Sequence, residues 1–249
     1  MKKRAPFFLL ALAFAYTASA DTLADVKAAL ARLNATQPLR GTYSARNEVK
    51  SAGKFDNSQS ARDAAFEVVQ DSTGVHLTIP PALVTKAGSE AKALAAADTS
   101  GRSAIGAIDP LDIVDAVDFR DSLLGLLSIG KVAEEKRGAF NGRNVRLLVL
   151  KLSQPERKSG GEVRLGKSSR EEDRLTLWLG DDDVPLGAER VTKTKGGFLI
   201  FRFESTNRTS HVFGRRGDRI YLARSEESGA ASGMGQKIDS KAVMTLTVQ

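Results

Sequence analysis

Arg174-Leu175-Thr176-Leu177-Trp178-Leu179 is the stretch that decides the fold, because it is a short apolar run that ends at the turn-forming residues Gly180 to Asp183. Such a run is typical of a β-strand. Further short runs of this kind cover residues 146–152, 186–194, 198–205 and 219–224. The turns between them, such as Lys195-Gly196-Gly197, are short, and short turns favour an antiparallel meander.

Helices are expected before and between these strands. Apolar residues recur at helical spacing between residues 22 and 34, which predicts a short amphipathic helix. Asp109 followed by Pro110 marks the start of a second helix, whose apolar residues continue to Leu127. One helix, a few strands, further helices and a long run of hairpins predict an α+β fold with a mainly antiparallel sheet.

Residues 1–20 are predicted to be a cleavable signal peptide. The chain begins with basic residues, an apolar run follows from Phe7 to Tyr16, and Ala18-Ser19-Ala20 matches the pattern that a signal peptidase cleaves. Cleavage is expected after Ala20. The apolar run is shorter than the roughly 20 residues that span a bilayer, so no stable membrane insertion is expected. The chain has no cysteine for a disulfide or a lipid anchor, which indicates a bacterial periplasmic protein.

The mature chain, residues 21–249, is expected to form a single β-rich domain. Removing residues 1–20 takes away three of the 37 basic residues and none of the 30 acidic ones, so the net charge falls from +7 to +4. Basic and acidic residues alternate along nearly every segment, whereas nucleic-acid binders usually show a clustered basic face. No nucleic-acid partner is therefore expected. Residues 153–172 are polar and predict a flexible insertion between two strands.

The order of these elements resembles the LolA/LolB-like superfamily of periplasmic lipoprotein carriers. The resemblance is carried by the signal peptide, by the first helix leading into Gly41-Thr42-Tyr43-Ser44-Ala45, and by residues 175–179 followed by Val184-Pro185-Leu186. It implies a strongly curved sheet, an incomplete β-barrel closed by helices. It also implies an apolar ligand, such as a lipid or the acyl chain of a lipoprotein.

No motif in the sequence carries a reaction. Residues 161–168 match G-x-x-x-x-G-K-S, but no apolar strand leads into Gly161 and no helix is expected at Lys167, so the match is interpreted as chance. The only histidines, His76 and His211, lack a nucleophile elbow or enough further ligands for zinc. Asp181-Asp182-Asp183 is interpreted as a hairpin turn rather than a calcium site. No enzymatic activity, cofactor or metal is predicted.

Apolar residues on both faces of several strands supply the candidate ligand site. Side chains alternate between the two faces of a strand, so Trp178 is expected on the face opposite Leu175, Leu177 and Leu179. If those leucines pack under the helices, the indole faces a concave surface, with Phe198 and Ile200 as neighbours. The candidate ligand-binding residues are Leu147, Val149, Trp178, Phe198 and Ile200. An ordinary core on both faces explains the pattern equally well.

Two functions follow from this sequence. The first is a non-enzymatic periplasmic carrier or binding protein that holds an apolar ligand, either a lipid or a lipoprotein acyl chain. The alternative is a protein-interaction or envelope-sensing domain on the same fold, which binds an envelope protein partner without an open ligand cavity.

Overall fold

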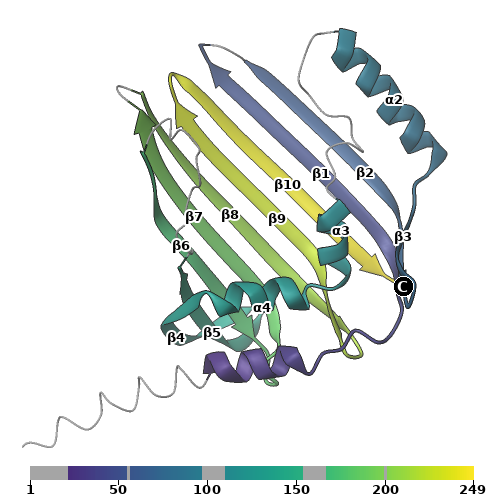
Figure 1. Cartoon of the computed structure of the whole chain (residues 1–249), viewed down its shortest axis with the longest axis vertical. Helices are drawn as coiled ribbons and strands as arrows, with labels where there is room; N and C mark the ends of the chain where they lie inside the picture. Colours follow the sequence, from purple (N-terminus) through teal and green to yellow (C-terminus); the bar gives the residue numbers. More distant parts are fainter. Residues whose placement is uncertain (1–21, 55–56, 97–109, 154–166, 199–200) are drawn as a thin grey trace, which may run out of the picture.

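One antiparallel sheet of ten strands dominates the computed structural model, which describes residues 22–54, 57–96, 110–153, 167–198 and 201–249 (Figure 1). The strand order is β3-β2-β1-β10-β9-β8-β7-β6-β5-β4. The mainly antiparallel sheet predicted from the sequence is confirmed. The strands are β1 (Leu39–Gly53), β2 (Ser58–Asp71), β3 (Gly74–Thr78), β4 (Gly130–Phe140), β5 (Arg143–Leu152), β6 (Lys167–Leu179), β7 (Pro185–Phe198), β8 (Phe201–Arg216), β9 (Arg219–Gly233) and β10 (Gln236–Val248).

Pairing of β1 with β10 joins the two ends of the described chain. These strands run antiparallel from Gly41 opposite Val248 to Gly53 opposite Gln236. All other neighbours in the sheet follow one another in sequence, as a meander requires. The sheet is open, because β3 and β4 lie at its two edges.

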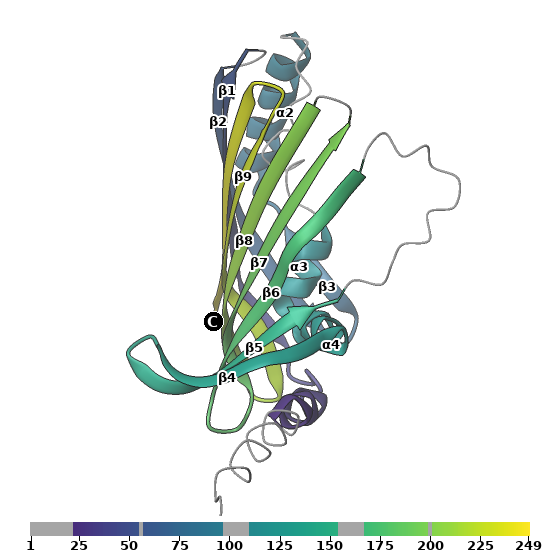
Figure 2. The ribbon, with the colours of Figure 1, turned by 90° about the vertical axis from the view of Figure 1, so that its left-hand side faces the viewer.

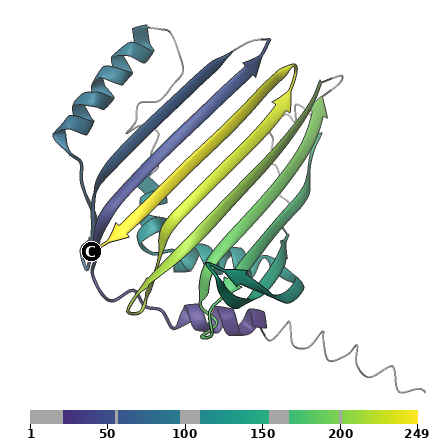
Figure 3. The ribbon, with the colours of Figure 1, turned by 180° about the vertical axis from the view of Figure 1, so that it is seen from behind.

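Helices lie against one face of the sheet, near one end of the strands. They are an N-terminal helix (residues 22–31), α3 (Pro110–Val117) and α4 (Arg120–Ser128), while α2 (Pro81–Ala96) runs along β2 at the edge (Figures 1 and 2). The single helix expected from Asp109 to Leu127 is thus two helices. The opposite face carries no helix from the described part of the chain (Figure 3). None of the described helices is long and apolar enough to cross a membrane.

The core lies between these helices and the sheet. Leu148, Leu177 and Leu123 are completely buried there, which joins β5 and β6 to α4. Burying one leucine side chain contributes about 1.5–3 kcal/mol to folding. The N-terminal helix buries Leu30 in the same core, as its helical spacing predicts. The apolar side chains on this face therefore fix where the helices pack.

The helix-free face carries charged side chains that form ion pairs between neighbouring strands. Glu189 on β7 accepts hydrogen bonds from Arg208 on β8, and Glu172 on β6 lies 2.7 Å from Lys193 on β7.

Apolar residues on both faces, expected for several strands, occur on β5, where Leu147 and Val149 alternate with Leu148 and Leu150. On β6 the residues that alternate with the buried leucines include Arg174 and Thr176 beside Trp178, so the second face is only partly apolar there.

Three sequence boundaries need correction. β6 begins at Lys167, so Lys167–Glu172 is a strand and not part of the insertion; residues 154–166 lie outside the described residues. The predicted turn at Lys195-Gly196-Gly197 lies inside β7, and the predicted strand 198–205 spans the β7–β8 connection instead. Residues 226–237, whose glycine, serine and alanine content is typical of a loop, form the β9–β10 hairpin. These segments are polar or rich in glycine and have a low intrinsic strand propensity. They are strands because they hydrogen-bond to neighbouring strands.

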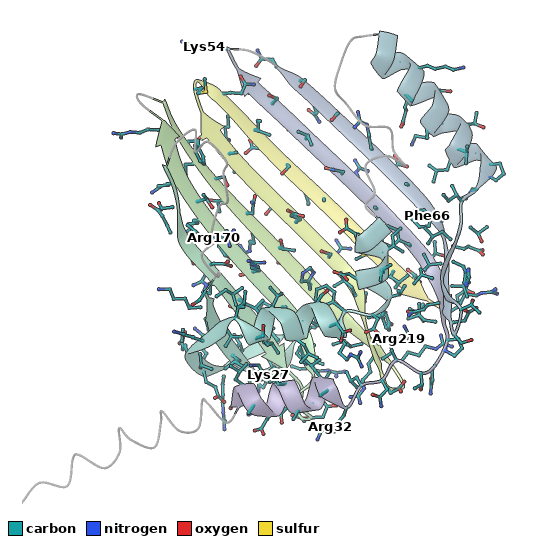
Figure 4. All side chains as sticks on the ribbon, viewed as in Figure 1. Lys27, Arg32, Lys54, Phe66, Arg170 and Arg219 are labelled. Carbon is teal, nitrogen blue, oxygen red and sulfur yellow. The ribbon has the colours of Figure 1, made fainter. Side chains whose placement is uncertain are left out.

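A buried arginine ties the helix-bearing end of the sheet together. Arg219 at the start of β9 is 3% exposed (labelled in Figure 4). Its guanidinium donates hydrogen bonds to the carbonyl oxygens of Val117 at 3.2 Å, Ala35 at 2.6 Å and Gln37 at 2.9 Å, and to the side chain of Gln70. One side chain therefore links α3, the segment before β1 and the end of β2.

Candidate functional site

Three of the predicted ligand-binding residues lie together on the helix-free face. Leu147 pairs directly with Trp178, and Val149 lies two positions further along β5. Leu175, Leu177 and Leu179 are buried on the opposite face, so the predicted alternation around Trp178 is confirmed.

Phe140 covers Trp178 from the end of β4. The two ring centroids are 5.4 Å apart, and Phe140 also lies over Gly187, the residue of β7 that pairs with Trp178. A Cβ atom on Gly187 would come within 2.6 Å of the Phe140 ring. The indole is therefore packed against another aromatic ring on this face, and it does not line the cavity described below.

The predicted neighbours of Trp178 lie elsewhere. Phe198 is the last residue of β7 and pairs with Phe201, eleven positions along the strand from Gly187. At about 3.3 Å per residue this separation is roughly 35 Å, so the prediction that Phe198 adjoins Trp178 is wrong. Ile200 lies outside the described residues. The register, which sequence could not supply, is the reason for the error.

The two motifs interpreted as inert have ordinary structural roles. Lys167 and Ser168 begin β6, whereas a phosphate-binding loop requires a helix there. Residues 180–184 form the tight β6–β7 turn, in which the amide of Gly180 donates to the carbonyl of Val184 at 3.0 Å. Asp182 and Asp183 in this turn pair with Arg215 and Arg146. The turn prediction is confirmed.

A cavity of about 290 Å³ lies between α3 and the sheet, on the helix-bearing face. Its floor crosses four strands. Ala45 of β1, Met244 of β10, Ser225 of β9 and His211 of β8 lie side by side in one row, as the strand register shows. A second row, one step further from the core, contains Asn47, Ala242, Glu227 and Thr209. The wall is formed by Asp112 and Asp115 of α3 and by Phe119, which lies between α3 and α4.

The lining is apolar next to the core and mixed further out. Leu222 and Phe119 are buried at the inner end, and Ala45 and Met244 are the apolar residues of the first row. Ala242 lies in the second row among the polar residues Asn47, Glu227 and Thr209. The cavity is therefore amphipathic, with its apolar part next to the protein core.

His211 is a titratable group of this cavity whose ring is largely enclosed by the protein. Its ring lies 5.0 Å from the Phe119 ring and 6.1 Å from the Phe213 ring, centroid to centroid. Burial lowers the pKa of His211 from 6.5 to about 4, because the imidazolium loses its hydration. The side chain is thus neutral at pH 7. Its Nδ1 atom is buried and has no hydrogen-bond partner among the described residues.

Carboxylates lie around the same cavity. Asp115 on α3 accepts a hydrogen bond from Ser122 Oγ of α4 at 2.8 Å, which holds the two helices together. Burial, and secondarily the charge of Asp112, raise the pKa of Tyr43 to about 12. Asp112 thus lies close enough to act on the phenol of β1. The phenol therefore stays protonated near neutral pH.

Sequence reasoning missed most of this cavity. Tyr43 belongs to the stretch that carries the family resemblance, but it was not assigned to the site, and His211 was interpreted as structural. Asp112 and Asp115 were visible only as ordinary acidic residues near a helix start. No local signal shows that α3 would lie above β1, β8, β9 and β10, because this placement depends on the pairing of β1 with β10. The chain matches no protein-family model and no curated protein sequence.

Proposed function

We propose that this protein is a non-enzymatic carrier or binding protein that holds an apolar group in the cavity under α3. The observation that carries the proposal is the cavity itself, whose inner part is lined by Phe119, Leu222 and Met244 next to the core. Small-molecule sites are usually concave, largely apolar pockets with a few polar groups. The arrangement of the lining agrees with this description.

The volume indicates the size of the occupant. Ligand sites for small molecules commonly measure about 300–1,000 Å³, and the cavity of about 290 Å³ lies just below this range. It is suited to one acyl chain or one ring system rather than to several chains together.

The proposal includes export to the periplasm, directed by a signal peptide at residues 1–20, and a LolA/LolB-like incomplete barrel closed by helices. With both of these, the ligand would be a lipid or a lipoprotein acyl chain. The open meander with helices on one face supports this view. The cavity under α3 replaces the surface around Trp178 as the proposed binding site.

Binding of the neutral fluorophore 1-N-phenylnaphthylamine tests the proposal. Saturable binding with a rise in emission is expected. Ala242→Trp places an indole on the cavity floor and is expected to weaken binding by about tenfold or more. Lys241→Trp is the matched control, because Lys241 is the exposed neighbour of Ala242 on β10 and faces away from the cavity. It is expected to bind like the wild type.

Absence of saturable binding, or equal loss in both variants, would contradict the carrier. A purified protein that carries a protein partner and no lipid in native mass spectrometry would favour the interaction domain instead. The natural fluorescence of Trp178 is a poor reporter for this assay, since the indole packs on Phe140 on the other face.

A further inference from the structure

The polar groups of the cavity lining are dominated by hydrogen-bond acceptors. Three carboxylates line it: Asp112, Asp115 and Glu227. A carboxylate accepts hydrogen bonds but donates none, and its two oxygens offer about four acceptor positions. The neutral imidazole of His211 adds one more acceptor nitrogen, since one of its two ring nitrogens carries no proton.

The acceptors come from opposite sides of the cavity. Asp112 and Asp115 are three residues apart on α3, a spacing that places them on the same side of a helix. Glu227 is on the floor, where it pairs with Ala242 of β10 and Thr209 of β8. A ligand group that enters between α3 and the sheet therefore meets carboxylates on both sides, from α3 and from the floor.

Among the described residues, no basic side chain of the lining faces Asp115 or Glu227. Arg46 contributes to the lining, but it alternates with Ala45 and Asn47 along β1, so its guanidinium lies on the opposite face, 2.8 Å from Glu48. Asp115 uses one acceptor position for Ser122. The exposed side chain of Glu227 forms no hydrogen bond or ion pair with the described part of the chain. Acceptor capacity is thus unused at the polar end of an apolar cavity.

We propose that the ligand of this cavity is a cationic amphiphile, an apolar body that carries a protonated amine. Its apolar part would lie on Leu222 and Met244, and its ammonium group would donate to Glu227 and to the carboxylates of α3. The inference rests on the proposed function and names the ligand class for the same site. An anionic amphiphile, such as a free fatty acid, would place its carboxylate next to three like charges, and this repulsion is unfavourable at low ionic strength.

Competition against 1-N-phenylnaphthylamine tests the ligand class. The probes are dodecylamine, dodecanol and dodecanoate at low ionic strength, all kept below the concentrations at which they aggregate. Dodecylamine is expected to displace the fluorophore at concentrations about tenfold lower than those that dodecanol requires. Dodecanoate is expected to require higher concentrations than either of the other two probes. Glu227→Gln combined with Asp112→Asn is expected to remove the advantage of the amine over the alcohol while dodecanol still competes as before.

Glu226→Gln combined with Asp121→Asn is the matched control. It removes the same two charges, but Glu226 pairs with Arg224 and Asp121 is an exposed residue of α4, both away from the cavity. This variant should keep the full preference for the amine. A preference that falls equally in both double variants would mean that net charge alone attracts the amine, and it would overturn the inference.

The two proposals fail separately in this experiment. If dodecanol competes and Ala242→Trp blocks it, but dodecylamine has no advantage or dodecanoate binds better, the cationic ligand class is refuted and the carrier stands. If none of the probes competes and the fluorophore itself does not bind, the carrier fails, and the ligand class fails with it.

Discussion

Lowering the pH from 7.5 to 5 is expected to destabilise the fold by about 2 kcal/mol through His211 alone. Burial holds the pKa of this histidine at about 4 in the folded state, against 6.5 for the free side chain. The folded-state pKa is depressed, so the unfolded chain binds more protons between these two values. The stabilisation is complete above about pH 6.5 and is lost progressively as the pH falls to about 4.

The magnitude follows from the two pKa values. At pH 5 the unfolded histidine is almost fully protonated, whereas the folded one is about one-tenth protonated, which gives about 2 kcal/mol from proton linkage. Below pH 4 the same difference approaches about 3 kcal/mol. Two aromatic rings, Phe119 and Phe213, surround the imidazole, which explains why its charged form is poorly solvated.

Urea unfolding of the wild type and of His211→Asn across this pH range isolates the effect. Carboxylates titrate in both proteins, so the difference between their pH slopes reports the histidine. The variant is expected to lose about 2 kcal/mol less than the wild type between pH 7.5 and 5. His76→Asn is the control, because it removes the other histidine from an exposed position on β3. Parallel pH slopes for wild type and His211→Asn would refute the buried neutral imidazole.

Three further changes test the packing of the sheet. Arg219→Met removes the donor to three backbone carbonyls and is expected to lower the free energy of unfolding by about 3 kcal/mol in a urea titration. Arg208→Ala is the control, because it breaks only an ion pair at the surface and should lower the same free energy by less than about 1 kcal/mol. Leu177→Ala leaves a cavity in the core, with an expected loss of about 3 kcal/mol by thermal and urea unfolding. Gly187→Ala is expected to displace Phe140 and to shift the tryptophan emission to longer wavelength, with a loss of about 1–3 kcal/mol. An unchanged emission spectrum would contradict the contact between these residues.

Pairing between strands that are distant in sequence determines the candidate site more than it determines which segments are helices and strands. Trp178 was placed correctly relative to its own strand, because alternation is a local property of the backbone. Its supposed neighbour Phe198 was misplaced by roughly 35 Å, because β7 continues through two glycines that looked like a turn. The same extension moved the β7–β8 connection, and it separated the aromatic residues that sequence reasoning had brought together.

What the sequence by itself determined is the set of properties that depend on residues close together in the chain. These are the helix over residues 22–31, the meander of antiparallel strands, the aspartate turn at 181–183 and the failure of the G-x-x-x-x-G-K-S match to open a helix. Only the tertiary structure decided that β1 pairs with β10 and that α3 lies over the strands next to this pair. The cavity of Tyr43, His211 and Glu227 follows from those two contacts, because its residues come from segments more than 160 positions apart and meet only through the register of the sheet.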